Sequence, residues 1–153
     1  MSKVEPLRAE SGDEGNGYVL ERQVGHLLRR AHQRHCAIFQ ENIGAAQLTP
    51  LQFAAMVKLR DLAEVSQNQL GRLTAMDAAT MQGVIKRLAV RGLIDRRPDP
   101  GDRRRLILSL SPAGEALIDG AIPDGAEISR LTLSPLSPGE RRTLLDLLAR
   151  IAE

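Results

Sequence analysis

A chain of 153 residues has the usual size of one domain and can bury most of the surface that its unfolded form exposes. Aromatic residues make up only 2% of it, so the core must be aliphatic, which favours packed helices over a β-sandwich. The net charge of +2 conceals a local excess, because residues 86–105 carry eight basic and three acidic side chains. Such a basic zone points to a polyanion at one face, with an ordinary solvated surface as the plainer alternative.

The cysteine count and the lengths of the apolar segments bear on where in the cell the protein is expected. The single cysteine, Cys36, allows no intrachain disulfide. The chain has neither an apolar signal segment at its N-terminus nor an apolar run near the roughly 20 residues that span a bilayer. We therefore expect a cytoplasmic protein with no membrane partner. Residues 1–17, rich in Gly, Glu and Ser, are expected to form a disordered tail.

Apolar spacing and capping residues mark the first two helices. From Tyr18, apolar residues recur at helical spacing and predict one long amphipathic helix that ends near Gly44. Thr49 is followed by a proline and, three residues on, by a glutamine. This is the pattern of a capped helix start, and it predicts a second helix that runs to about Leu62.

Two more capped helices follow. Ser66, with a glutamine three residues on, predicts a short third helix ending around Leu73. Asp77 caps a fourth helix, which Gly92 can end in a left-handed conformation. Two capped helices joined by a short turn form a candidate helix-turn-helix. The buried side of the fourth helix is expected to consist of Met81, Val84, Ile85 and Leu88.

A β-hairpin is expected after the fourth helix. Residues 93–97 and 105–110 predict two strands, and residues 98–102 between them combine Pro, Asp and Gly in strong turn chemistry. Apolar and polar residues alternate in the second strand, so one of its faces packs inward. This hairpin is the expected wing of a winged helix-turn-helix.

Helices close the chain. Ser111-Pro112 opens one that is expected to be broken or bent near Pro123 and Gly125, and Ser137 caps a last, leucine-rich one. The predicted fold is therefore mainly α with a small β wing. There are no internal repeats.

The segment from the turn of the helix-turn-helix to the end of the wing resembles a known family. It reads LTAMDAATMQGVIKRLAVRGLIDRRPDPGDRRRLILSLSPAG and contains R-L-x-x-R-G-L-I, the D-x-R of Asp102 and Arg104, and a closing L-S-x-x-G. With these motifs at this spacing, the chain closely resembles the MarR family of bacterial transcriptional regulators over residues 18–153. The resemblance implies a DNA-binding core at 49–111, with dimerisation helices at 18–44 and 112–153.

The resemblance gives the wing arginines a function. They repel one another and lack enough nearby carboxylates, so DNA phosphates would supply the missing negative charge. The resemblance implies that Arg104 enters the minor groove, where a narrow A·T-rich tract has an enhanced negative potential, while Asp102 holds it in position. Arg103 and Arg105 would lie close to the DNA backbone. Alternatively, Asp102 and Arg104 merely staple the hairpin.

The fourth helix would then be the recognition helix in the major groove. Thr80 and Gln82 are the expected base readers, because glutamine pairs with adenine and threonine contacts the thymine methyl group. Small residues at the helix start let the backbone approach the duplex, and the third helix offers amide and dipole contacts to phosphates. The other expected DNA contacts on these helices are Gln67, Asn68, Ala78, Ala79, Lys86 and Arg87.

A homodimer is expected as well. One winged domain reads half of a site, so specificity needs two recognition helices about one DNA turn apart, roughly 34–36 Å. The first helix and the last two have apolar surface that the winged core cannot cover. Dimerisation through these helices is also what the family does.

Members of this family often bind a small anionic or aromatic effector between the dimerisation helices and the winged domain. His32, His35 and Cys36 occupy one helical face here. They suit a metal site, a pocket for an aromatic carboxylate, or ordinary surface and core. The R-x-H-x-R-H-C and AMDAATMQGV stretches look most similar to repressors of aromatic or N-heterocyclic acid catabolism, including nicotinate-type regulators. The pocket candidates are His26, Arg30, His32, Arg34, His35, Phe39, Phe53 and Met56.

Other classes of function are less well supported. No metal or other cofactor is expected, because His-x-x-His-Cys supplies only two or three ligands and no second cluster accompanies it. Thiol sensors of this family hold their cysteine with tyrosines, whereas the only tyrosine here is Tyr18. The chain lacks phosphate-loop, nucleophile-elbow and H-E-x-x-H motifs, so it is not expected to be an enzyme. A metal- or thiol-responsive regulator and a winged-helix protein-docking module are the alternatives.

Overall fold

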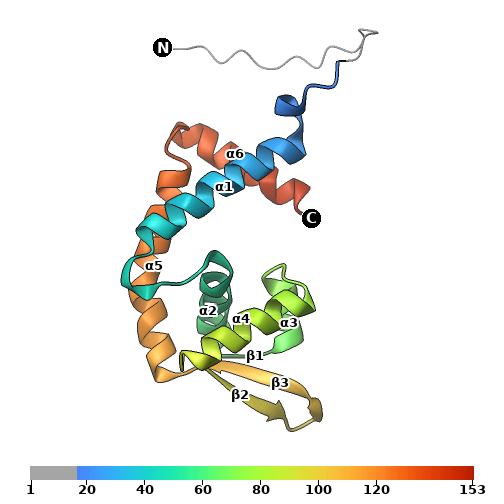
Figure 1. The fold of residues 1–153 in the computed structure, drawn as a ribbon, viewed down its shortest axis with the longest axis vertical. Helices are drawn as coiled ribbons and strands as arrows, with labels where there is room; N and C mark the ends of the chain where they lie inside the picture. Colours follow the sequence, from blue (N-terminus) through green and yellow to red (C-terminus); the bar gives the residue numbers. More distant parts are fainter. Residues whose placement is uncertain (1–16) are drawn as a thin grey trace. The chain divides into compact units, whose positions relative to one another are not determined.

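The computed structural model describes residues 17–153. The tail expected at 1–17 lies outside this range apart from Gly17. Figure 1 shows the fold of the chain as a ribbon. The chain falls into two compact units, with the boundary between residues 32 and 33. None of the helices in the described part of the chain combines the length and apolarity that crossing a membrane requires.

The first long helix begins later than its apolar pattern predicts. A 3-10 turn, η1 (Leu20–Arg22), comes first, and α1 runs from Val24 to Asn42. The predicted start at Tyr18 is wrong because Gln23 is extended, with φ −82° and ψ 137°, and separates the two helical pieces. The end agrees with the prediction to within two residues, and Gly44 follows with a φ of +65° at the start of the turn η2 (Gly44–Ala46).

The next three helices confirm the predictions made from capping residues. They are α2 (Pro50–Leu62), α3 (Gln67–Leu73) and α4 (Ala78–Val90). Thr49 forms a reciprocal capping box with Gln52, in which each side chain accepts a hydrogen bond from the other residue's backbone N–H. Ser66 and Asp77 cap α3 and α4, and Gly92 follows α4 with the left-handed φ of +71°.

The sheet has one strand more than predicted. Its three antiparallel strands, β1 (Glu64–Ser66), β2 (Ile94–Asp99) and β3 (Asp102–Leu110), lie in the order β1-β3-β2. Strand β1 was missed because it has only three residues, too few to show a period of two. The wing strands extend further toward the tip than predicted, which shortens the turn to Pro100 and Gly101.

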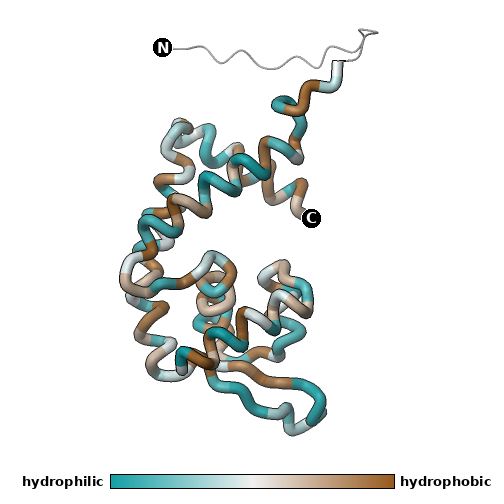
Figure 2. The backbone as a smooth tube through the Cα atoms, in the orientation of Figure 1, coloured by the Kyte–Doolittle hydropathy of each residue, from teal (hydrophilic) through white to brown (hydrophobic). Residues whose placement is uncertain are grey.

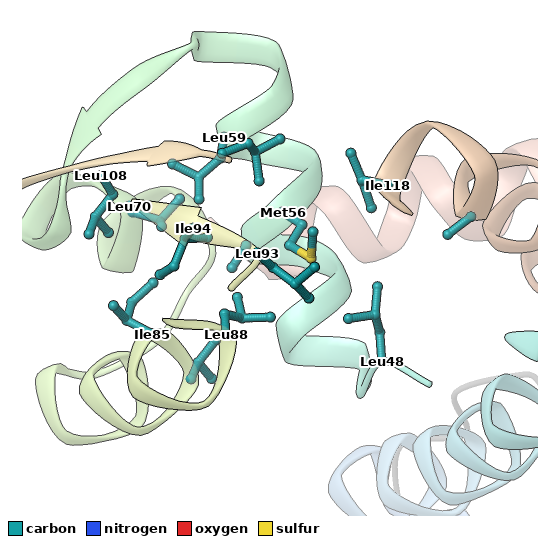
Figure 3. Packing of buried hydrophobic residues seen from close by; sticks show 14 of the residues in the cluster. Leu48, Met56, Leu59, Leu70, Ile85, Leu88, Leu93, Ile94, Leu108 and Ile118 are labelled. Atoms are coloured by element: carbon teal, nitrogen blue, oxygen red, sulfur yellow. The ribbon is translucent and has the colours of Figure 1, made fainter. Parts of the chain in front are cut away.

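The core lies between the sheet and the helices around it. The predicted inner side of α4 is buried in full, and it packs with residues of α2, α3, β3 and α5 in one apolar cluster (Figure 3). Members that lie close together in Figure 3 are Met56, Leu59, Leu70, Ile85, Leu88, Leu93, Ile94 and Leu108. The core is therefore aliphatic and built mainly from helices, as the composition predicted.

The helix after the wing is not broken. α5 runs without interruption from Pro112 to Thr132 through Pro123, and α6 spans Pro138–Ile151. Of the two predicted alternatives, a break or a bend, the break is wrong: buried residues on both sides of the proline, Ala121 and Ile128, anchor the two halves in the same core. Gly125 lets α5 pack closely against Phe53, because a Cβ at this position would lie 2.4 Å from the Phe53 ring.

A compact junction joins the end of α4, the base of the wing and the start of α5. Ser111 Oγ donates to Gly92 O at 2.6 Å and accepts from Gly114 N at 3.0 Å. The backbone N–H of Ser111 donates to Leu93 O at 3.0 Å. A Cβ on Gly114 would lie only 1.9 Å from Leu93 O, so the start of α5 packs directly on the backbone there.

Candidate nucleic-acid interface

The outer face of α4 carries the residues predicted to contact DNA. Thr80 is half-buried, and its predicted neighbours on the helix are exposed. The opposite face is fixed in the core by Met81, Ile85 and Leu88. The exposed members of the predicted set are Ala78, Ala79, Gln82, Lys86 and Arg87. The helix therefore presents two small residues at its start and two cations further along.

The cap of α4 also places a charge at the helix start. Asp77 Oδ1 accepts a hydrogen bond from the Thr80 backbone N–H at 2.7 Å. This backbone bond is the main cause that lowers the pKa of the Asp77 carboxyl below its usual value. Asp77 is therefore ionised at neutral pH and satisfies one of the unpaired N–H groups of the first turn.

The start of α3 lies beside the wing, which the sequence alone did not show. Gln67 is half-buried and Asn68 is exposed, directly after the capping Ser66. These residues and the wing residues Arg104 and Arg105 line a common hollow of about 110 Å³. Amide groups of α3 and guanidinium groups of the wing thus face the same small space.

Asp102 braces the wing through the backbone. Its Oδ1 accepts a hydrogen bond from the Arg104 backbone N–H at 3.0 Å, and Asp99 Oδ1 accepts one from Gly101 N at 2.9 Å. Both bonds order the hairpin tip, where the tube in Figure 2 is hydrophilic. Arg103, Arg104 and Arg105 are exposed.

Most basic side chains of this face form no ion pair within the described part of the chain. Within residues 17–153, the ion pairs are Arg60–Asp119, Arg97–Glu64 and Arg130–Glu127. Only Arg97 among the wing arginines is paired, at 2.8 Å from Glu64 of the unpredicted strand β1. The three arginines at the start of β3 therefore keep their positive charge available to an external anion.

The predicted effector residues are distributed over both units of the chain. Arg34 donates to the carbonyls of Thr132 at 2.6 Å and Leu131 at 3.1 Å, at the end of α5. His35 Nδ1 lies 2.8 Å from Thr132 Oγ1, so these two residues attach the C-terminal half of α1 to α5. His26, Arg30 and His32 belong to the other unit, residues 17–32.

The predicted apolar members of the effector pocket belong to the core or pack against it. Phe39 and Phe53 meet edge to face, with ring centroids 5.8 Å apart, and His35 lies next to Phe39. Met56 is fully buried in the aliphatic core. No group of three or more His, Cys, Asp or Glu residues within 17–153 has an arrangement able to hold a metal ion.

Comparison with known proteins agrees with this geometry. Residues 46–105 match the MarR family. The transcriptional repressor NicR of Pseudomonas putida is 46% identical over 136 residues, which cover 89% of this chain and 86% of NicR.

Solved structures show the same winged-helix fold. BpsR of Bordetella bronchiseptica, studied for the regulation of its DNA binding by 6-hydroxynicotinic acid, is 42% identical with a TM-score of 0.84, covering 89% of this chain and 97% of BpsR. The repressor CouR, solved on a 23-mer DNA duplex, is 29% identical with a TM-score of 0.80, covering 88% of this chain and 95% of CouR. From its fold, its motifs and these similarities, the chain belongs to the MarR family of transcriptional regulators.

Proposed function

We propose that the protein is a homodimeric transcriptional repressor that binds a pseudo-palindromic operator and leaves it when a small aromatic or N-heterocyclic carboxylate binds. One observation carries the DNA-binding part. Exposed, unpaired arginines at the start of β3 share a hollow with the start of α3, beside the exposed face of α4. Such a set of cations around a recognition helix suits a DNA backbone and a minor groove.

The relatives support the rest of the proposal by similarity. NicR is a repressor, CouR binds a DNA duplex, and the DNA binding of BpsR is regulated by 6-hydroxynicotinic acid. We place the action of this chain in the cytoplasm, where bacterial DNA lies. Dimerisation is expected because one winged domain reads only half of a two-fold site.

Each contact follows from its place in the fold. Arg104 enters the minor groove, and the bond from Asp102 to its backbone fixes where its side chain starts. Arg103 and Arg105 neutralise phosphates, as Lys86 does from α4. Gln82 and Thr80 read base edges in the major groove. The small residues before them let the helix backbone approach the duplex closely. Gln67 and Asn68 bind the DNA backbone from α3.

The substitution Arg104→Ala tests this function. We expect it to weaken operator binding about tenfold or more and to reduce the salt slope by about 0.9 for the lost ionic contact. Fluorescence anisotropy at several salt concentrations measures both, using a duplex selected from random DNA. The matched control is Arg130→Ala, which removes the same charge from an exposed ion pair on α5 and leaves binding unchanged.

Two outcomes would contradict the proposal. A wild-type protein that binds no duplex in dilute buffer would favour the protein-docking alternative. Equal losses of operator affinity in Arg104→Ala and Arg130→Ala would show that only the total charge of the protein matters. A specific DNA interface would lose affinity only when the wing arginine is removed.

A further inference from the structure

We propose that Arg91 is a positioning residue, which sets how α4 lies in the DNA groove without contacting DNA itself. The inference rests on the proposed function. Arg91 is the C-cap of α4, and Gly92 after it has a φ of +71°. Its Nη2 donates a hydrogen bond to Ala46 O at 2.8 Å, and its Nη1 donates one to Gln47 O at 3.1 Å. These two bonds, the Arg91 clamp, join the proposed recognition helix to the turn η2.

The acceptors of the clamp lie in a well-packed part of the fold. Ala46 ends η2 and is only 7% exposed, and carbonyl groups at the end of a helical turn need partners from outside it. Gln47 follows in the left-handed conformation, with φ 49° and ψ 44°. A Cβ on Gly44 would lie 3.8 Å from Asp124 Oδ2, so η2 lies against α5. The clamp therefore attaches α4 to a turn that itself packs on α5.

The clamp supplies a direction that apolar packing does not. The inner face of α4 is held in the core by Met81, Ile85 and Leu88, and hydrophobic contacts are non-directional. A guanidinium is planar and holds its donors in a fixed fork. Two bonds to neighbouring carbonyls therefore fix the orientation of the helix end as well as its distance from η2. The ammonium group of a lysine has no such fork.

The clamp lies at the opposite end of α4 from the proposed base readers. The 13 residues of α4 precede Arg91, so the first turn begins about 20 Å away along the helix axis. A rotation of about 3° about the clamped end shifts that turn by about 1 Å, twice the range of about 0.5 Å over which N–H···O bonds form. Bonds from Thr80 and Gln82 to base edges depend on this placement, whereas phosphate contacts carry no sequence information. Loss of the clamp therefore lowers specificity before it lowers general affinity for DNA.

The competing explanation for Arg91 is direct contact with a DNA phosphate. Arg91 belongs to the basic zone at 86–105 and forms no ion pair with a carboxylate of residues 17–153. Removing a phosphate ligand weakens binding to every sequence alike and lowers the salt slope by about 0.9. Removing a positioning residue weakens binding to the operator alone and leaves the slope unchanged. The two explanations are therefore distinguishable by experiment.

Fluorescence anisotropy with two duplexes of equal length tests the inference. One duplex carries the operator that the wild-type protein selects from random DNA, and the other carries a scrambled sequence. We expect Arg91→Lys and Arg91→Ala to bind the operator about tenfold more weakly, and the scrambled duplex within about twofold of the wild type. Both variants should keep the wild-type salt slope on the scrambled duplex. Circular dichroism checks that each variant is folded, and Arg91→Lys decides alone if Arg91→Ala is not.

Lys86→Ala is the matched comparison, because Lys86 is a proposed phosphate contact on the same helix. It should weaken binding to both duplexes alike and lower the salt slope by about 0.9. The inference fails if Arg91→Ala behaves as Lys86→Ala does, if Arg91→Lys binds the operator as tightly as the wild type, or if neither Arg91 variant loses discrimination between the duplexes. A wild-type protein that binds neither duplex would instead contradict the proposed function.

Discussion

The carboxylate of Asp77 accepts the Thr80 N–H bond at the first turn of α4, and this bond holds its pKa below the ordinary value. A carboxyl whose pKa is lower in the folded state stabilises that state above its unfolded pKa of about 3.9. This contribution is lost as the pH falls through the folded value. One ionised group thus stabilises the first turn of α4, the proposed recognition helix.

Two substitutions of Asp77 separate capping from charge. Asparagine caps nearly as well as aspartate but does not ionise, whereas alanine does neither. We expect Asp77→Asn to lower the melting temperature slightly at pH 7, with the difference from wild type closing below about pH 4. Asp77→Ala should be less stable than Asp77→Asn throughout. Thermal unfolding followed by circular dichroism between pH 3 and 7 measures both, and a pH-independent gap for Asp77→Asn would contradict the account.

For single residues, the sequence predicts which residues interact more reliably than it predicts which of their atoms form the hydrogen bond. It singled out Asp102 and Arg104 as partners, but the bond in the structure goes to the backbone N–H of Arg104. A D-x-R motif is compatible with either bond, because both groups lie within reach of the same carboxylate. The pairing of Arg97 with Glu64 was out of reach of sequence reasoning, since strand pairing creates it.

Among the elements, α5 offers a matched pair of glycines. A Cβ on Gly114 would meet Leu93 O at 1.9 Å, whereas a Cβ on Gly120 would have nothing within 4 Å. Overpacking typically costs 1–3 kcal/mol, so we expect Gly114→Ala to lose about 3 kcal/mol or more of unfolding free energy. Gly120→Ala should gain about 0.5–1 kcal/mol from helix propensity. Urea denaturation of both variants measures the contrast, and equal effects would rule out the close junction.

The elements that were predictable from sequence are those fixed by nearby residues. The caps at Thr49, Ser66 and Asp77 each bond a residue three positions on, so their patterns can be recognised in the sequence. Strand β1 exists because it pairs with β3, more than forty residues later in the chain. The continuity of α5 through Pro123 likewise depends on packing with residues distant in sequence. Helix-breaking residues such as proline indicate only the local preference of the chain and not this packing.

For the whole molecule, the apolar surface of α6 bears on assembly. Leu145, Leu147 and Ile151 are 53%, 48% and 65% exposed in the single chain. Exposed apolar surface of this kind marks an interaction site, and the proposed homodimer would cover it. We expect Leu147→Glu to shift the protein toward monomers and to weaken operator binding more than binding to a single half-site. Analytical ultracentrifugation and anisotropy measure the two effects.

Arg142→Gln provides the control for this prediction. Arg142 is exposed and lies about 140° around the same helix from Leu147, and the substitution changes the charge by the same amount. It should leave both assembly and operator binding as in the wild type. A Leu147→Glu protein that remains dimeric would place the dimer contact elsewhere.

The charge map of the whole chain was predictable, but the places of the predicted effector residues in the fold were not. Counting residues locates the basic zone at 86–105 without any structure. Periodicity cannot say which apolar face becomes core, and Met56, expected in the effector pocket, is fully buried. A hollow beside α4 combines residues of the stretches 47–52 and 83–91, which only folding brings together.

The hydrogen bonds at Ser111 connect the base of the wing to the start of α5, so we expect the two to move together. β3 has nine residues, so it reaches about 30 Å from its pivot at Ser111 to its far end. Tilting α5 by about 5° would sweep the hairpin tip through roughly 2.5 Å on an arm of that length. Such a sweep is nearly the length of a hydrogen bond, enough to withdraw a guanidinium from a groove. A subtle change among the helices would thus be magnified where the protein meets its operator.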